Sequence, residues 1–485
     1  MITEKNMHSS GYGRQVRQKL AGLLLWPLLC LVMVLAPVTE STALSIGEER
    51  KIGEKLLFSV RAEFDLVDAP DITAYINDLG AQVLGVVGVT NFDYHFYVVK
   101  SDQFNAFAAP AGLVFFYTGL IEQMRNEDEL VGVLAHEIGH VVSRHIAGRI
   151  DKSGKINAIT TALGIAGIAL GVPALSQGLL AGSLAAGATI NLQYSRADEE
   201  QADRLSYEWM RAMGRNPEAL TGMLGTMRRI TRYSLSELPQ YLLTHPQPEV
   251  RLDYIESLLD LDQANPQQFA PTDNFAFLRF KYRIMAVSRD PAQLRELCVL
   301  NLSRGASKEQ EVMAHYGLAL LDAQERNYAG AMVHFDKVEQ AYPDRRILLV
   351  DRAVLLRNIG KNKEALQLLR EAVYRDPTSM YAAFELGRTL IFQGNMEEAE
   401  PYLLEVATNQ PDFSQAYFEL GRITARLGRA GESRFYLAKY YLYTGKIQQA
   451  KKALQQVVAE ANLPGKRQTE AEDLLQKIEE IEKKT

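Results

Sequence analysis

Residues 131–145 read VGVLAHEIGHVVSRH, an apolar segment that contains a glutamate and two closely spaced histidines. His136 and His140 are four residues apart, so on a helix they project from one face, about 6 Å apart. Two imidazoles in this arrangement can hold one zinc ion, and the Glu137 carboxylate can reach a water on that ion. The stretch therefore predicts a metal-binding helix with hydrolytic chemistry, although a lone match to this pattern also arises by chance.

The surroundings of the motif favour a buried helix that holds its histidines rigidly. Asn126, followed three residues later by Glu129, fits a helix cap. Gly139 leaves room for another element to pack closely near the metal. His145 is nine residues from His136, so we expect it to face away from the site as a surface or packing histidine.

Composition and charge exclude one class of partner. The chain has 485 residues, of which 47% are hydrophobic and 23% charged, an ordinary globular composition. This length suggests roughly two to four domains. The formal net charge is -6 and no long basic run is present, so we expect no nucleic-acid partner.

Residues 1–43 have the organisation of a signal peptide. Arg14 and Arg17 precede the uncharged run 20–38, and small residues follow as far as Ala43. We predict cleavage after Ala43, because small residues mark a signal-peptidase site. The alternative is an uncleaved membrane anchor, since the apolar run nearly spans a bilayer.

The region 44–270 combines strand and helix signals. YHFYVV (94–99) and GLVFFYTG (112–119) are β-branched and aromatic runs, separated by NAFAAPAG. Helical patterns surround them, at about 45–61, 70–87, 126–147, 195–214 and 216–232. The fold class predicted for this region is α+β, a mostly helical domain with a small β-sheet.

The region 311–485 repeats with a period of 34 residues. Pro343, Pro377 and Pro411 have this spacing, and ELGR occurs at 385–388 and again at 419–422. That period is typical of tetratricopeptide repeats, which stack antiparallel helix pairs into an all-α superhelix. Glycines that recur with the same spacing are expected at the turns between helices. A further unit near 431 implies a shared helix, and residues 467–484 suit a terminal cap.

Two other segments have separate predictions. Residues 271–310 read as a helical connector that follows a Pro- and Asn-rich boundary.

Residues 156–195 contain no charge and are split by Pro173. We expect two close-packed helices on the catalytic domain, able to make a peripheral membrane contact. The alternative is a transmembrane hairpin, for which each half is barely long enough.

A second helical stretch, YSRADEEQADRLSYEWM (194–210), offers a third metal ligand. Glu199 and Asp203 are four residues apart and share a helix face. A catalytic zinc site needs three protein ligands and an open fourth position. Glu199 would complete a His₂Glu set, and Asp203 would accept the free ring N–H of a ligand histidine. Taken alone, the segment fits a solvated acidic face equally well.

Four motifs occur together and in a characteristic order: NAFAAPAGLVFFYTGLI, HEIGH, YSRADEEQAD and THPQPEVRL. In this the chain resembles the gluzincin metalloprotease family that includes the CaaX prenyl proteases and heat-shock membrane proteases. The resemblance covers nearly the whole mature chain. It departs at PAG (110–112), where relatives commonly show two glycines.

The resemblance implies roles for individual residues. His136, His140 and Glu199 would bind one zinc ion per chain, and Asp203 would support a ligand histidine. His245, in THPQPEVRL, would face the zinc, where it either stabilises the transition state or fills the fourth position as a self-inhibiting plug. Arg251 and Arg196 are expected to form structural ion pairs near the site.

The same resemblance implies a mechanism and a substrate class. Glu137 would act as general base towards water and then deliver the proton to the leaving amine. The strand near 112–118 is expected to be a sheet edge to which an extended peptide adds. Clients would be unfolded or misassembled envelope proteins of the outer membrane, in the periplasm. The repeats would bind clients or outer-membrane assembly machinery.

Two functions therefore remain open at this point. The first is a secreted zinc endopeptidase of quality control. The second is a periplasmic chaperone or scaffold whose repeats carry the function and whose zinc site is self-inhibited. All the catalytic residue types are present, which favours the enzyme.

Overall fold

The computed structural model describes residues 44–152, 193–233, 239–262, 267–303, 305–460 and 463–482. The predicted signal peptide and most of the uncharged stretch 156–195 lie outside these ranges. Within them, no helix has the length and apolar character that a membrane crossing requires.

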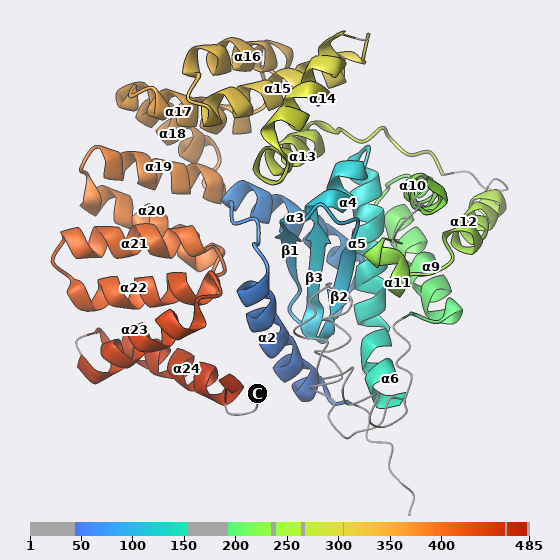
Figure 1. Ribbon diagram of the computed structural model, residues 1–485, viewed down its shortest axis with the longest axis horizontal. Helices are drawn as coiled ribbons and strands as arrows, with labels where there is room; N and C mark the ends of the chain where they lie inside the picture. The colour runs from blue at the N-terminus through green and yellow to red at the C-terminus, as the bar shows by residue number, and fades with distance from the viewer. Residues whose placement is uncertain are drawn as a thin grey trace, which may run out of the picture. The chain divides into compact units, whose positions relative to one another are not determined.

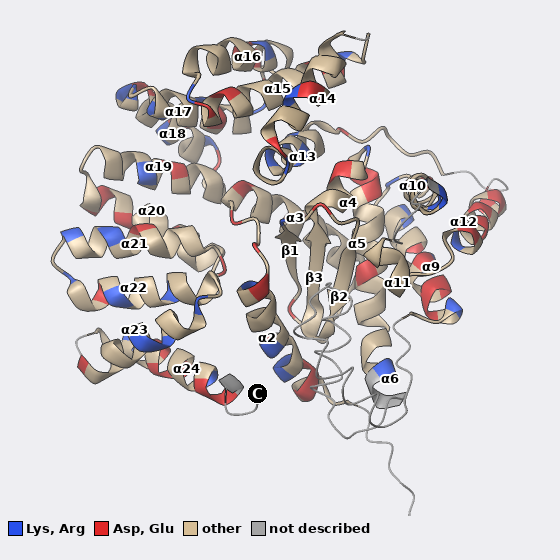
Figure 2. Cartoon of the chain, in the orientation of Figure 1, with Lys and Arg blue, Asp and Glu red and all other residues tan. Residues whose placement is uncertain are grey.

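A three-stranded sheet lies at the centre of the first region (Figure 1). Its strands are β1 (His95–Val99), β2 (Ala106–Ala109) and β3 (Leu113–Tyr117). Their order is β1-β3-β2, with β1 parallel and β2 antiparallel to β3. All three strands lack charged residues, as Figure 2 shows, and every residue of β3 is buried. The predicted α+β class is confirmed.

Two details of the sheet differ from the sequence prediction. The segment expected at the edge is the central strand β3, paired on both sides, because its side chains are apolar on both faces. The strand β2 was missed, since AFAA has only one residue typical of strands. Within the described residues β2 pairs only with β3, so β2 and not β3 is the edge on this side.

Helices enclose this sheet and one another. They are α2 (Ile46–Glu63), α3 (Pro70–Val87), α4 (Thr118–Gln123), α5 (Glu127–Val142), α6 (His145–Lys152), α9 (Arg196–Ala212), α10 (Ala219–Tyr233), α11 (Gln240–Thr244) and α12 (Pro248–Asp262). The helix α5 packs against β2, α9 and α10, which explains why nearly all of its residues are buried.

The predicted helix 126–147 is in fact two helices. The first, α5, ends at Val142, and α6 begins at His145. Between them Arg144 adopts a left-handed conformation with φ of 53°. This residue interrupts the helix, so the face on which a residue after Arg144 lies cannot be found by counting along α5.

The C-terminal region consists of stacked helix pairs, as the 34-residue period predicts (Figure 1). The helices are α15 (Lys308–Gln324), α16 (Tyr328–Ala341), α17 (Ile347–Asn358), α18 (Asn362–Arg375), α19 (Met380–Phe392), α20 (Met396–Asn409), α21 (Ser414–Arg426), α22 (Ala430–Tyr443), α23 (Ile447–Glu460) and α24 (Gly465–Glu482). Gly360, Gly394 and Gly428 have positive φ at the turns within successive pairs. The helix α22 packs on both α21 and α23, so it is the shared helix.

A buried ion network joins the connector to both neighbouring regions. Arg279, on α13 (Phe275–Ser288), bonds Asp71 of α3 at 2.9 Å and Asp351 of α17 at 2.6 Å. Arg283 also bonds Asp71, and the two guanidinium groups hold the pKa of this carboxyl below its usual range despite its burial. The next helix, α14 (Pro291–Ser303), packs on α15. Residues 44–485 form one compact unit, and the boundaries at 270 and 310 stay predictions.

We predict that Arg279→Met lowers the free energy of unfolding by about 3 kcal/mol, because it leaves a buried carboxylate without its cation. The matched control is Arg375→Met, whose pair with Glu371 is exposed and should contribute less than about 1 kcal/mol. Urea unfolding followed by circular dichroism measures both. Equal losses in the two variants would contradict the importance of the buried network.

Candidate metal centre

Three side chains of the HEIGH motif are held inside the protein by α5. His136, Glu137 and His140 are 2%, 0% and 0% exposed. The Asn126 side chain accepts from the Glu129 backbone N–H and caps the helix, as predicted. Packing on the sheet and on α9 and α10 fixes the direction in which the two imidazoles point.

Two of the acidic residues of α9 face α5 and are buried. Glu199 and Asp203 are 2% and 3% exposed, whereas their neighbour Glu200 is exposed. The alternative interpretation of this segment, a solvated acidic face, is therefore wrong for Glu199 and Asp203. Close approach of the two helices is possible because a Cβ on Gly139 would lie only 3.3 Å from Ala202 Cα.

Four donor atoms converge at this packing. His136, His140, Glu199 and His245 each offer one nitrogen or oxygen, and all these atoms lie within 4.8 Å of one another. His136 Nε2 is 3.1 Å from His140 Nε2 and 3.4 Å from His245 Nδ1. Glu199 Oε1 is 3.0 Å from His245 Nδ1 and 3.5 Å from His140 Nε2. A tetrahedral zinc with bonds of 2.0–2.1 Å would separate its ligand atoms by about 3.3 Å, so the donor set has the dimensions of such a site.

Asp203 and Arg251 support the donors from behind. Asp203 Oδ1 accepts from His136 Nδ1 at 2.9 Å, which leaves Nε2 facing the cluster. Arg251, from α12, bonds both oxygens of Asp203 at 2.7 and 2.8 Å and approaches Glu199 at 2.9 Å. Burial favours neutral acids, but His245 and Arg251 hold the pKa of Glu199 well below its usual range. The prediction of ion pairs holds for Arg251, while Arg196 forms none with any described residue.

The charge balance of the cluster favours a divalent cation. Glu137, Glu199 and Asp203 supply three buried carboxylates, and Arg251 is the one buried guanidinium among the described residues in contact with them. With the imidazoles neutral, as metal binding requires, two negative charges remain uncompensated. Burial and Arg251 favour neutral His136, yet Asp203 and Glu199 raise its pKa to about 9. The site therefore favours positive charge, and its residues fit a metal ion of charge two.

His145 does not face away from the site, and that prediction is wrong. It is buried, and its Nδ1 lies 2.8 Å from His140 Nδ1. The left-handed Arg144 between α5 and α6 turns the ring back towards His140. Counting nine residues along one helix could not reveal this contact, because the helix ends before His145 is reached.

Aromatic rings complete the enclosure around the histidines. Tyr194 stacks on His140 with ring centroids 3.8 Å apart, and Tyr241 stacks on His245 at 4.2 Å. Tyr241 Oη also donates to Glu137 Oε1 at 3.2 Å. The other oxygen of this buried carboxylate, Oε2, has no hydrogen-bond partner in the described structure. Glu137 is therefore held by one oxygen and free to act through the second.

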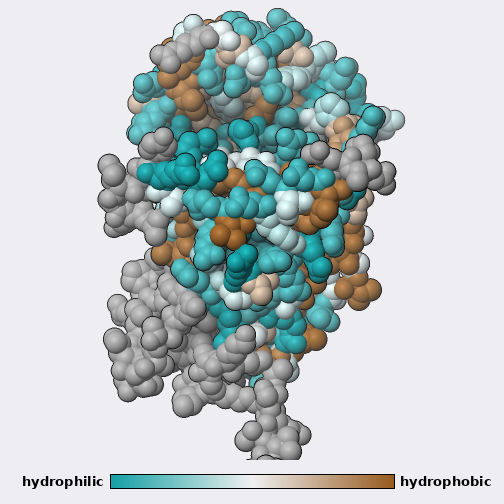
Figure 3. Space-filling model, turned by 90° about the vertical axis from the view of Figure 1, so that its right-hand side faces the viewer, coloured by the Kyte–Doolittle hydropathy of each residue, from teal (hydrophilic) through white to brown (hydrophobic). Residues whose placement is uncertain are grey.

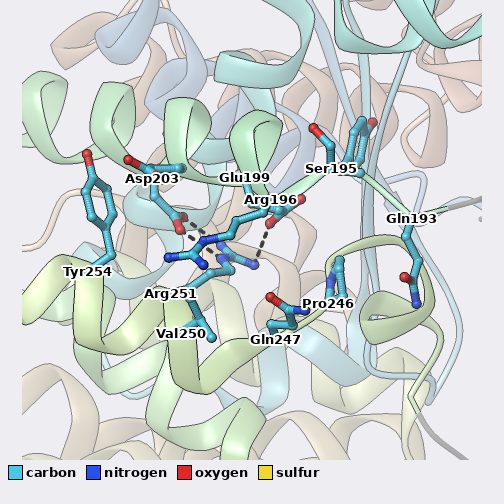
Figure 4. Close-up of a pocket in the computed structure, with 12 residues that line it drawn as sticks. Gln193, Ser195, Arg196, Glu199, Asp203, Pro246, Gln247, Val250, Arg251 and Tyr254 are labelled. Atoms are coloured by element: carbon cyan, nitrogen blue, oxygen red, sulfur yellow. Dashed lines mark hydrogen bonds and ion pairs between the residues drawn. The ribbon is translucent and has the colours of Figure 1, made fainter.

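A pocket of about 240 Å³ opens beside the cluster, between α9 and the segment that leads into α12 (Figure 4). Figure 4 shows Arg251 reaching between Asp203 and Glu199, with Ser195 and Gln247 nearby. The surrounding face mixes hydrophilic residues with separate hydrophobic clusters (Figure 3). Of the four donors only Glu199 lines this pocket, which therefore lies on the Asp203 and Arg251 side of the cluster. Here α9 and α12 carry exposed acidic and basic residues (Figure 2).

Comparison with known proteins decides the family. The model of peptidase family M48 matches residues 70–259, and tetratricopeptide repeat models match 359–423 and 432–462. A Beta-barrel assembly-enhancing protease of Yersinia pestis is 30% identical over 336 residues, which cover 68% of this chain and 67% of the relative. The chain belongs to peptidase family M48. It is a metalloprotease that also carries tetratricopeptide repeats.

Other relatives agree with this assignment. The Beta-barrel assembly-enhancing protease of Escherichia coli strain K12 is 29% identical over 338 residues, covering 69% of this chain and 68% of that protein. Metalloprotease LoiP of the same organism is 28% identical over 194 residues, covering 40% of this chain and 71% of its own length. The similarity to the first of these two proteins covers 338 residues, more than the M48 match at 70–259.

We predict that Gly139→Val destabilises the protein by about 1 to 3 kcal/mol, because the added side chain overpacks the contact between α5 and α9. Gly225→Val is the matched control, since a Cβ on Gly225 of α10 meets nothing within 4 Å. Thermal unfolding of both variants provides the measurement. A loss in the control as large as in Gly139→Val would refute the close packing.

Proposed function

We propose that this protein is a zinc-dependent endopeptidase that hydrolyses misfolded or misassembled proteins of the cell envelope, in the periplasm. The observation that carries this proposal is the buried His₃Glu donor cluster next to a carboxylate with one unpartnered oxygen. The names of two relatives, both Beta-barrel assembly-enhancing proteases, support outer-membrane proteins as clients.

Zinc is the ion that suits these donors. Imidazole nitrogens and one carboxylate oxygen at tetrahedral separations are the usual ligands of catalytic zinc. His136, His140 and Glu199 would hold one ion per chain. When bound, zinc supplies Lewis acidity that activates water and polarises a peptide carbonyl.

Glu137 performs the proton transfers. Its Oε1 is fixed by the Tyr241 hydroxyl, so Oε2 is the oxygen that can accept a proton from water. The same carboxylic acid then delivers that proton to the amine that leaves when the peptide bond breaks. Asp203 holds His136 in the tautomer that presents Nε2 to the ion, and Arg251 keeps Asp203 ionised.

His245 occupies the fourth donor position. Its Nδ1 is as close to Glu199 and His136 as a ligand would be, and the ring is fully buried against Tyr241. A water cannot take the same position, so we propose that the described arrangement is a self-inhibited resting state. Activity then requires that the segment between α11 and α12 moves His245 away.

The substrate would bind as an extended chain. Because β3 is central, the sheet edge on the side of α5 is β2, whose residues are all buried. A peptide could add to this strand by backbone hydrogen bonds once the edge is uncovered. Unfolded or misassembled proteins offer such backbone, whereas folded ones do not. The tetratricopeptide repeats would bind clients or outer-membrane assembly machinery, which is the general use of such arrays in protein–protein contact.

A second candidate function is that of a periplasmic chaperone or scaffold. The buried position of His245 favours this candidate. If His245 fills the fourth position, the metal site cannot activate water, and the function would depend on the repeats. The two candidates differ in what Glu137 contributes.

We predict that Glu137→Gln lowers the cleavage rate of an unfolded client by about 10²- to 10⁴-fold, the usual contribution of a general base, while the zinc content is unchanged. The matched control is Glu200→Gln, an exposed change on α9 that should cleave as fast as the wild type. Undiminished cleavage by Glu137→Gln, or full rescue of a deletion strain by it, would support the scaffold instead.

For His245→Ala, we predict faster cleavage of the same client, because the variant opens the fourth position while three ligands remain. Initial rates under client saturation and zinc content per chain are the measurements. Slower cleavage at full zinc content would show that His245 assists the reaction and is not a plug.

A further inference from the structure

His145 contacts groups on both sides of its ring. Its Nδ1 is 2.8 Å from His140 Nδ1. Its Nε2 is 3.2 Å from Gln201 Oε1 and 3.7 Å from an Asp198 oxygen, both on α9. The ring is therefore a bridge from α9 to the face of His140 that points away from the donor cluster.

The chemistry of these neighbours fixes where the protons lie. A carboxylate oxygen and an amide oxygen are both acceptors, so His145 Nε2 carries the hydrogen. In a neutral ring Nδ1 is then an acceptor, and the short contact requires that His140 Nδ1 donates to it. This leaves His140 Nε2 with its lone pair directed at the cluster, 3.1 Å from His136 Nε2.

The backbone before His145 is held in place at some cost. Arg144 has a left-handed φ of 53°, a backbone angle that residues other than glycine seldom adopt. Its guanidinium bonds Glu49 of α2 at 2.8 Å and also contacts the Leu44 carbonyl. Such a strained conformation persists only where the surrounding contacts hold it. The contacts of Arg144 with α2 therefore also fix the position of the next residue, His145.

We propose that His145 is a positioning residue that fixes the tautomer and orientation of His140 for metal binding. It performs for His140 the task that Asp203 performs for His136. The two ligand histidines of α5 thus have separate partners. His136 is held by Asp203, which Arg251 bonds. His140 is held by His145, which contacts Gln201 and Asp198. This inference rests on the proposed metal site and names a residue outside the donor set.

The test is the affinity of the purified full chain for Zn²⁺ itself, measured by competition with a chromophoric chelator at fixed pH. His145→Ala should weaken binding about 10- to 100-fold, the usual effect of removing a partner of a ligand histidine. His145→Asn should bind nearly as well as the wild type, because the asparagine oxygen can accept the His140 N–H where Nδ1 does. The spectrum of the Co²⁺-loaded protein should change for His145→Ala and be preserved for His145→Asn.

The control is His334→Ala, which removes one ring of a close histidine pair away from the site, His315 and His334 in the repeats, and should leave zinc affinity unchanged. Unchanged affinity in His145→Ala, or equal weakening in the Ala and Asn variants, would overturn the inference. If His145→Ala fails to fold, His145→Leu, which fills the space but offers no acceptor, replaces it in the comparison with His145→Asn. Failure of the wild type to bind zinc would instead refute the proposed function.

Discussion

The surplus of buried negative charge between α5 and α9 is the constraint on which the rest of the site depends. Three carboxylates in this space have negligible exposure, and one guanidinium, that of Arg251, neutralises only part of them. Burial of an uncompensated charge costs several kcal/mol. A divalent cation among the imidazoles would remove that cost, so metal binding and the packing of the two helices depend on each other.

The surrounding fold supplies this packing and its rigidity. The helix α5 lies between the sheet and α9, with Gly139 against Ala202 at the closest approach. Backbone contact also ties the entrance of α9 to the His245 segment, since the Tyr194 N–H donates to the Thr244 carbonyl at 2.9 Å. His136, His140 and Glu199 are therefore each fixed both by their own helix and by a contact from another part of the chain.

The connection to the repeats uses the same kind of interaction. Arg279 joins α3 of the M48 region to α17 of the repeats through two buried carboxylates. Asp412, in the turn before α21, accepts from Tyr97 of β1 at 2.5 Å and pairs with Arg61 of α2 at 2.9 Å. The repeats thus contact the sheet that bears the edge strand.

Much of this arrangement could be predicted from sequence, and the failures have physical causes. The spacing of four residues predicts that His136 shares a helix face with His140, and Glu199 with Asp203. Such a prediction succeeds because the face on which a helical residue lies depends only on local sequence spacing. The strand β2 lacks β-branched residues and depends on pairing with β3 for its conformation. Whether β3 is central or at an edge also depends on pairing that no local pattern encodes.

The case of His145 is the most instructive. Its contact with His140 follows from one left-handed residue, Arg144, whose conformation is held by ion pairing with a helix about a hundred positions earlier. No helical count could anticipate that. In contrast, the proximity of Arg251 to the site was predictable from the family resemblance, and only its double contact with Asp203 and Glu199 required the structure.

The most direct test of the central claim is the location of the metal itself. Diffraction data collected on either side of the zinc absorption edge should give one anomalous peak per chain, bounded by His136, His140, Glu199 and His245. Absence of a peak in zinc-replete crystals, or a peak that Glu199 does not contact, would contradict the account.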